Sequence, residues 1–189
     1  MDNFTKQFFD AVIRDDVKEV EHCLNRGMDI ECKHEKGSTA LIAAAYSGSI
    51  NTMKFLIAQK ANIEAIGSQG QTALHKAAGG GNTECAEMLL KHGANTEVRG
   101  EDGSTPLCLA AAFGHKKAVT LLLQHNADIE SKGTDERTPL AGAACEGQTE
   151  CVKELLKHGA NIEARKKTWK HSSHSCFGIW SSQHSKIIA

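Results

Sequence analysis

The stretch that decides the fold is TALHKAAGGGNTECAEMLLKHGAN, Thr72 to Asn95, because its plan returns 33 residues later as TPLCLAAAFGHKKAVTLLLQHNAD, Thr105 to Asp128. Four units keep a threonine, a leucine, a pair of alanines, a glycine and a pair of large apolar residues in the same register. The threonines are Thr39, Thr72, Thr105 and Thr138, and the glycines are Gly48, Gly81, Gly114 and Gly147. A period of this length predicts a row of like-shaped units.

Each unit predicts two short helices. The threonine can cap the first helix, and Pro106 and Pro139 occupy its first position, where a missing amide costs nothing. The glycine can end that helix in the left-handed conformation. A second helix carries apolar residues at helical spacing, as in Val119, Leu122 and Leu123. Because helices of about ten residues are marginal alone, we expect each unit to bury its face on its neighbours.

The same stretches resemble the ankyrin-repeat family. TALHKAAGGGN and TPLCLAAAFGH are similar to its T-P-L-H-x-A-A-x-x-G-H signature, and AEMLLKHGAN is similar to its V-x-x-L-L-x-x-G-A-D segment. The resemblance implies an all-α solenoid of stacked helix–turn–helix units joined by β-hairpin-like loops. We expect the array to span residues 4–168, as an N-terminal capping unit at 4–36 followed by units at 37–69, 70–102, 103–135 and 136–168.

The pattern stops in the last part of the chain. Residues 169–189 lack the threonine, leucine, alanines and glycine of a further unit and are rich in serine and histidine. We expect this atypical tail to be disordered or loosely packed; it could instead fold back over the last unit or replace further repeats. The spacing of four possible metal ligands fits no zinc pattern, so we expect no metal and no cofactor. These ligands are His171, His174, Cys176 and His184.

Composition narrows the class of partner and the compartment. The chain holds 22 basic and 23 acidic residues, for a net charge of −1, which favours neither nucleic acid nor a membrane surface as partner. Its apolar runs are shorter than the roughly 20 residues that span a bilayer. Seven cysteines at irregular spacing indicate reduced thiols. We expect a monomer in the cytoplasm. The nucleus is the alternative, because the patch RKKTWK weakly resembles a nuclear-import signal.

The stretch LHKAAGGGN, residues 74–82, looks at first like a catalytic base beside a phosphate loop. A phosphate loop, however, precedes its helix, whereas these glycines are predicted to end one. His75 occupies the histidine position of the family signature, where the resemblance implies a hydrogen-bonding role between adjacent units. Other units place Ile42, Cys108 and Ala141 there, so no repeated catalytic role is possible. We predict no catalytic residue and no enzymatic activity.

Regularly spaced charges mark one edge of the predicted array. One glutamate per unit is followed two residues later by a basic residue in all units but one, where Ile66 stands. Residues two apart share a side of an extended segment, so this pattern predicts an exposed ladder of opposite charges. The glutamates are Glu31, Glu64, Glu97, Glu130 and Glu163, and the bases are Lys33, Arg99, Lys132 and Arg165.

The resemblance implies binding through the hairpin tips and the exposed surface of the inner helices. Twelve tip positions hold five acidic and two basic residues, a net charge of −3, so we expect a protein partner with a basic surface. On the inner-helix surface Tyr46 and Phe113 serve either as anchors for the partner or as packing for their neighbours. The tip positions are Glu35, Lys36, Ser38, Ser68, Gln69, Gln71, Glu101, Asp102, Ser104, Asp135, Glu136 and Arg137.

Two functions follow from these expectations. The first is a non-enzymatic protein–protein interaction module that acts as an adaptor or scaffold. The alternative is that the chain is a recognition fragment or isoform of a larger ankyrin-repeat protein whose enzymatic or channel domain lies elsewhere.

Overall fold

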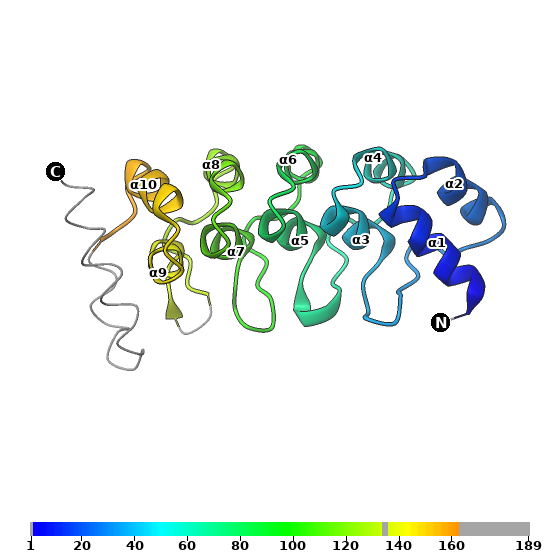
Figure 1. Cartoon of the computed structure of the whole chain (residues 1–189), viewed down its shortest axis with the longest axis horizontal. Coiled ribbons are helices and arrows are strands. Elements are labelled where there is room, and N and C mark those ends of the chain that lie inside the picture. The colour runs from blue at the N-terminus through cyan, green and yellow to red at the C-terminus, as the bar shows by residue number, and fades with distance from the viewer. Residues whose placement is uncertain (1, 134–135, 163–189) are drawn as a thin grey trace.

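The computed structural model describes residues 2–133 and 136–162, and within them ten α-helices form five consecutive pairs. Figure 1 shows the pairs side by side in one row, with the long loops projecting below the odd-numbered helices. We call α1, α3, α5, α7 and α9 the inner helices and the even-numbered ones the outer helices. Their bounds are α1 Asn3–Ile13, α2 Val17–Asn25, α3 Ala40–Ser47, α4 Ile50–Ala58, α5 Ala73–Gly79, α6 Thr83–Lys91, α7 Pro106–Ala112, α8 Lys116–Gln124, α9 Pro139–Cys145 and α10 Thr149–Lys157.

This all-α solenoid confirms the predicted fold class. In the described ranges no strand is present; an isolated antiparallel bridge joins Lys33 to Thr39, and a short 3₁₀ turn, η1, covers Ser68–Gly70. None of the described helices combines the length and apolar character needed to cross a membrane. The predicted tail at 169–189, with its four possible metal ligands, lies outside the described residues.

The inner helices begin at the predicted threonines, but the caps differ from unit to unit. Thr105 and Thr138 each accept a hydrogen bond from a backbone amide of the first helical turn. Thr72 makes its contacts through the ring of His75 instead. The buried Thr39 hydroxyl has no hydrogen-bond partner in the described chain. Caps of this kind stabilise a helix by about 1 kcal/mol where the bond is made.

The repeated glycine ends the inner helix as the sequence predicts. Gly48 has a φ of 76° and Gly81 a φ of 71°, in the left-handed region that side chains disfavour. Gly81 also meets a close neighbour, because a Cβ there would lie 2.5 Å from Nδ1 of His115. Glycine at this position is therefore required both by the backbone conformation and by the packing of the next unit.

The hydrophobic core is a row and not a central nucleus. Each outer helix from α4 onward buries a leucine completely, and the paired alanines of the inner helices are buried between neighbouring units. Every helix pair in extensive contact belongs to one unit or to two adjacent units. The leucines are Leu56, Leu89, Leu122 and Leu155.

The glutamate ladder has a different role from the predicted one. Each of the four described glutamates accepts a hydrogen bond from a backbone amide in the following unit, at 2.6–2.9 Å. Glu163 and Arg165 lie outside the described residues. Lys33 donates to the backbone carbonyl of Ile66 at 2.9 Å, and Arg99 donates to that of Lys132. The described residues therefore do not form the predicted ladder of opposite charges. The glutamates, Lys33 and Arg99 bind the backbone of the next unit, whereas Lys132 pairs with Glu136 of its own tip. The pairs are Glu31–Asn62, Glu64–Asn95, Glu97–Asp128 and Glu130–Asn161.

A second set of bonds joins adjacent units from the residue before each outer helix. Ser49 donates to the carbonyl of Ile13, and Asn82 donates to those of Ala45 and Tyr46. His115 Nε2 makes the same contact with the carbonyl of Gly79 at 2.9 Å. These carbonyls lie at the C-terminal ends of inner helices, where no amide of the same helix remains to bind them. In the sequence, these contacts between units are indicated only by a polar residue one position after each repeated glycine.

Candidate protein-binding surface

His75 is a structural residue inside the stack. Its side chain is 0% exposed, and its Nδ1 accepts a hydrogen bond from the Thr72 amide at 3.2 Å. The other nitrogen, Nε2, therefore carries the proton and donates to the carbonyl of Ser104 in the next unit, 3.1 Å away. Burial lowers the pKa of His75 from its ordinary value. The ring links two units in its neutral form, as the resemblance implied, and has no surface on which to act on a substrate.

The three glycines after His75 do not form a phosphate loop. Gly79 is the last residue of α5, so the glycines follow a helix and do not precede one. A Cβ on Gly79 would lie 3.5 Å from Cβ of Leu109 and 3.7 Å from the Phe113 ring, in ordinary contact with both side chains. Gly79 and Gly80 thus leave the middle of the inner-helix face without side chains.

The hairpin tips divide into exposed and buried positions. Six of the predicted residues are exposed, and Ser68 and Arg137 are half-buried. Ser38, Gln71 and Ser104 are buried, because each directly precedes the capping threonine where the loop has already returned to the helices. Asp135 lies outside the described residues. The exposed six are Glu35, Lys36, Gln69, Glu101, Asp102 and Glu136.

Two aromatic rings stand out on the inner-helix face. Tyr46 at the end of α3 is 69% exposed, and Phe113 directly after α7 is 61% exposed. Large apolar side chains this exposed leave most of the ring free to contact another molecule. Their role as anchors for a partner remains a prediction.

A pocket of 190 Å³ lies where the hairpins meet α7 and α9. It brings together Asp102, Ser104, Phe113 and Arg137, which the sequence had placed on the binding surface. Pockets for drug-sized ligands usually measure about 300–1,000 Å³, so this one suits a single side chain of a partner protein. Ala112 and Glu146, which the register of the repeat places on the inner-helix surface, also line it. Leu109 and Gly142 line it too and were not singled out from the sequence, because they have no counterpart in any binding motif.

Carboxylates outnumber the cations around this pocket, although Arg137 also lines it. Asp102 and Glu146 line it from two adjacent units, and the exposed Glu101 directly precedes Asp102. Asp102 also fixes its own loop, since its two oxygens accept bonds from the amide and the hydroxyl of Ser104 at 3.0 and 2.9 Å. The ordered loop and its negative charge suit a basic group approaching from solvent.

The described cysteines and acidic clusters show no reactive or metal-binding arrangement. Cys23, Cys32, Cys85, Cys108 and Cys151 are free thiols, and burial raises the pKa of Cys32 and of Cys85 to about 11. Such thiols stay protonated and unreactive at neutral pH. Among the residues that the structure describes, no three His, Cys, Asp or Glu side chains are placed to hold a metal ion.

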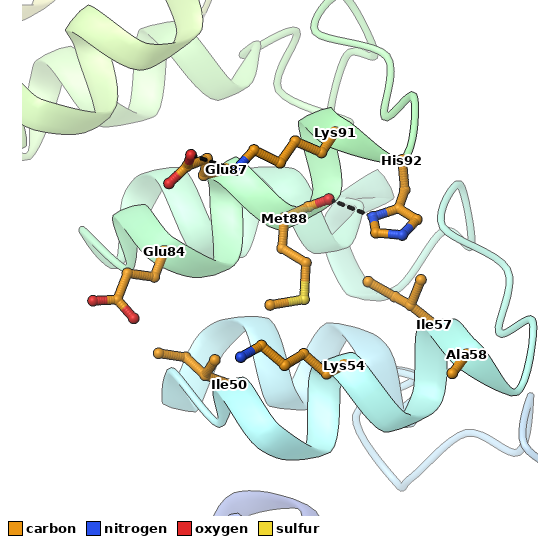
Figure 2. Close-up of a pocket in the computed structure, with 9 residues that line it drawn as sticks. All are labelled: Ile50, Lys54, Ile57, Ala58, Glu84, Glu87, Met88, Lys91 and His92. Atoms are coloured by element: carbon orange, nitrogen blue, oxygen red, sulfur yellow. Dashed lines mark hydrogen bonds and ion pairs between the residues drawn. The ribbon is translucent and has the colours of Figure 1, made fainter.

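A larger pocket, of 760 Å³, lies between α4 and α6 on the outer-helix side (Figure 2). It contains none of the residues that the sequence predicted for binding. The two pockets therefore belong to different faces of the array.

Comparison with known proteins bears on the fold and on the general class of function. No curated protein matches this chain. The family model described as ankyrin repeats (3 copies) matches residues 8–100 and residues 93–166, which together cover most of the chain. Ankyrin repeats are in general protein–protein interaction modules and not enzymes. The helix pairs, the capping threonines, the terminal glycines and this match agree, and the chain belongs to the ankyrin-repeat family.

Proposed function

We propose that this chain is a non-enzymatic adaptor or scaffold that binds one partner protein through the exposed hairpin tips and the inner-helix face. The observation that carries the proposal is the exposed Phe113 ring at the edge of a side-chain-sized pocket that Asp102 and Glu146 also line. The residues that contribute most of the binding energy in a protein interface are often aromatic and lie at pockets near its centre.

The partner carries a basic surface. Glu101 and Asp102 are exposed at the tip nearest the pocket. Glu136, at the next tip, contributes less, because Lys132 lies 2.8 Å from its carboxylate and already pairs with it. A lysine or arginine that enters the pocket can meet Asp102 and Glu146 while its aliphatic stem covers Leu109 and Phe113.

Tyr46 extends the surface toward the N-terminal end of the array. It lies two units from Phe113, and with interaxial distances of about 8–10 Å per step the two rings are roughly 16–20 Å apart. The glycines of α5 lie between them, so the backbone of the partner can approach closely there. We propose a protein and not a nucleic acid or a membrane as the ligand, and a cytoplasmic monomer as the binding form.

Affinity capture with quantitative mass spectrometry tests this proposal. We expect Phe113→Ala and Glu101→Lys each to reduce recovery of the same set of proteins by about tenfold, which corresponds to about 1.4 kcal/mol. Glu101 is preferred to Asp102 for charge reversal because Asp102 also holds its own loop. Glu21→Lys on α2 is the matched control, since it makes the same charge change at an exposed position far from the pocket. Recovery that is equal for all three variants and the unmodified chain would exclude this surface.

A further inference from the structure

The groove between α4 and α6 has an apolar floor and charged borders. Figure 2 shows Met88 of α6 pointing toward the side chains of Ile50 and Ile57 on α4. The exposed Lys54 borders the groove on α4, and the exposed Glu84 borders it on α6. The three apolar side chains are half-buried, and together they line an open groove of 760 Å³, a size that is typical of binding sites.

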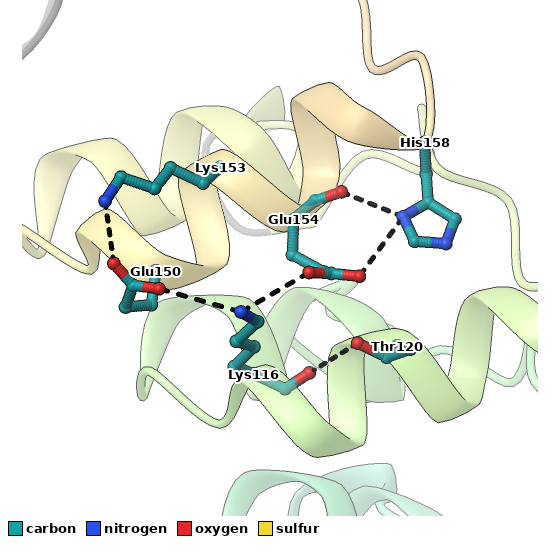
Figure 3. A network of polar contacts seen from close by, with 6 residues as sticks. All are labelled: Lys116, Thr120, Glu150, Lys153, Glu154 and His158. Carbon is teal, nitrogen blue, oxygen red and sulfur yellow. Dashed lines mark hydrogen bonds and ion pairs between the residues drawn. The ribbon is translucent and has the colours of Figure 1, made fainter. Parts of the chain in front are cut away.

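The same groove recurs between α8 and α10, where it is bridged by charges. Lys116 lies 3.6 Å from a carboxylate oxygen of Glu150 and 3.6 Å from one of Glu154 (Figure 3). Glu154 is 7% exposed and also lies 3.6 Å from the ring of His158. A lysine that reaches across from α8 therefore covers the middle of this groove and binds both acidic groups of α10.

The two grooves correspond residue by residue at an offset of 66, which is two units. Ile50 of the first groove occupies the position of the bridging Lys116 in the second, and Met88 occupies the position of the buried Glu154. The first groove therefore lacks the ion bridge, and Glu84 lacks the lysine that Glu150 binds. The corresponding pairs are Ile50 and Lys116, Lys54 and Thr120, Glu84 and Glu150, Glu87 and Lys153, Met88 and Glu154, and His92 and His158.

The fold does not need the open groove. Leu56 of α4 and Leu89 of α6 are fully buried beneath it and already join the two units to the core. The α8–α10 groove shows that this scaffold accepts a lysine and a glutamate at the two positions. In that groove the exposed Lys116 reaches over the buried Glu154, whereas Ile50 and Met88 are both half-buried apolar side chains with no charged group between them.

We propose that the α4–α6 groove binds an amphipathic helix of another protein, whose apolar side chains cover Ile50, Ile57 and Met88 and whose basic side chain binds Glu84. That basic group takes the role that Lys116 has beside Glu150. An acidic residue on the opposite border of the partner helix pairs with Lys54. The two nine-residue helices that form the groove are each roughly 14 Å long, so they match two to three turns of a partner helix with apolar residues at i, i+4 and i+7.

This site is separate from the tip surface. Its residues come from outer helices, whereas the pocket beside Phe113 is built from inner helices and hairpins. An adaptor with two such sites can hold two proteins at once. The proposal does not rest on the function proposed for the tips, and the two can fail independently.

The test grafts the ion bridge into the open groove. Ile50→Lys with Met88→Glu recreates the Lys116 and Glu154 arrangement and fills the groove with a pairing that this fold already contains. The matched control graft is Leu121→Glu, which makes the change of Met88→Glu at the equivalent position of the α6–α8 groove. Thr83, the equivalent of Ile50, is left unchanged because it directly precedes Glu84. Thermal unfolding of the full chain, followed by circular dichroism, establishes that both variants fold.

The probe is a fluorescein-labelled helical peptide of about 15 residues, with leucines at i, i+4 and i+7, lysines on one border and glutamates on the other. A second peptide has alanines in place of the leucines. Fluorescence anisotropy should show binding of the leucine peptide at micromolar concentrations. We expect at least about tenfold weaker binding to the grafted variant, about threefold weaker binding to Glu84→Gln, and unchanged binding to the control graft and to Phe113→Ala.

Three results would overturn the proposal. The first is an absence of saturable binding up to about 1 mM, or equal binding of the leucine and alanine peptides. The second is equal affinity for the grafted and unmodified chains. The third is evidence that something other than a partner helix binds in the groove. Both tryptophans lie at positions 169 and 180, so a shift in tryptophan emission caused by the graft would assign the groove to the C-terminal segment of this chain. A dimer in light scattering that the graft dissociates would assign the groove to a second copy.

Discussion

Replacing His75 by isoleucine should remove part of the pH dependence of folding. The ring is fully buried, and burial outweighs both its hydrogen bond to Ser104 and the charge of Asp102, so the pKa of His75 is lowered from 6.5 in the folded chain. In the unfolded chain the ring binds a proton below 6.5. Because the unfolded state then holds more protons, the free energy of unfolding falls as the pH drops from above 6.5 toward the folded-state pKa.

The size of the effect follows from the difference in proton binding. Between about pH 7.5 and about pH 5.5 the loss is at most about 1.4 kcal/mol, which is the limit for a ring that stays neutral in the folded chain over this range. Isoleucine is the appropriate replacement because Ile42 occupies the same position two helices earlier and is itself buried. At pH 7.5 the variant should already be less stable by about 1–3 kcal/mol, since the Thr72 amide and the Ser104 carbonyl lose their partner.

Urea unfolding, followed by far-ultraviolet circular dichroism at several pH values, measures both quantities. The unmodified chain should lose stability more steeply than His75→Ile between about pH 7.5 and 5.5, so the gap between the two curves should narrow toward the acidic end. Parallel curves would refute the assignment of a neutral, buried imidazole between these two units.

Three further substitutions test the contacts that join the units. Glu97→Ala should lower the free energy of unfolding by about 1 kcal/mol and Glu97→Gln by less, because glutamine still accepts from the Asp128 amide; equal losses in urea titrations would contradict this backbone role. Gly81→Ala should lower the melting temperature by several degrees, because its φ is 71° and the new Cβ meets His115. Adding His115→Ala should restore part of this loss, and a double variant no more stable than Gly81→Ala would contradict the clash. Burial raises the pKa of Asp15, but hydrogen bonds from the start of α4 outweigh this and lower it below 3.8, so the stability that Asp15 gives is present above pH 3.8 and is lost as the pH falls through its folded-state pKa. Asp15→Asn should make the loss of stability in acid less steep, and an unchanged acid titration would rule out the contact.

The repeat made most of the fold predictable from the sequence. Positions that recur every 33 residues are those that the stack constrains, so capping residues such as Thr105 and glycines such as Gly81 could be assigned before any geometry was known. The charged ladder was misread for a physical reason. Spacing along the sequence shows which side chains share an edge, but Glu97 finds its partner in a backbone amide of the next unit, and backbone groups leave no trace in a residue pattern.

The binding surface was harder to predict than the fold. Glu101 and Phe113 are exposed as expected, because loop tips and the outward side of a short helix can be read from the register. Ser104 is buried, since the loop turns back toward the helices one residue earlier than the repeat pattern indicates. The groove at Ile50 and Met88 was not predicted from the sequence, because its missing ion bridge is recognised only when two pairs of adjacent units are compared in the structure.

The arrangement of buried contacts also determines how the protein yields to force. Each interface joins only adjacent units, so tension along the row is borne by one interface at a time and the weakest one ruptures first. The seven-residue α5 ends in Gly79 and is followed by Gly80, and each glycine inside or beside a helix costs about 1 kcal/mol relative to alanine. We therefore predict that the array yields first at α5, in the middle of the row, and separates there into two folded blocks.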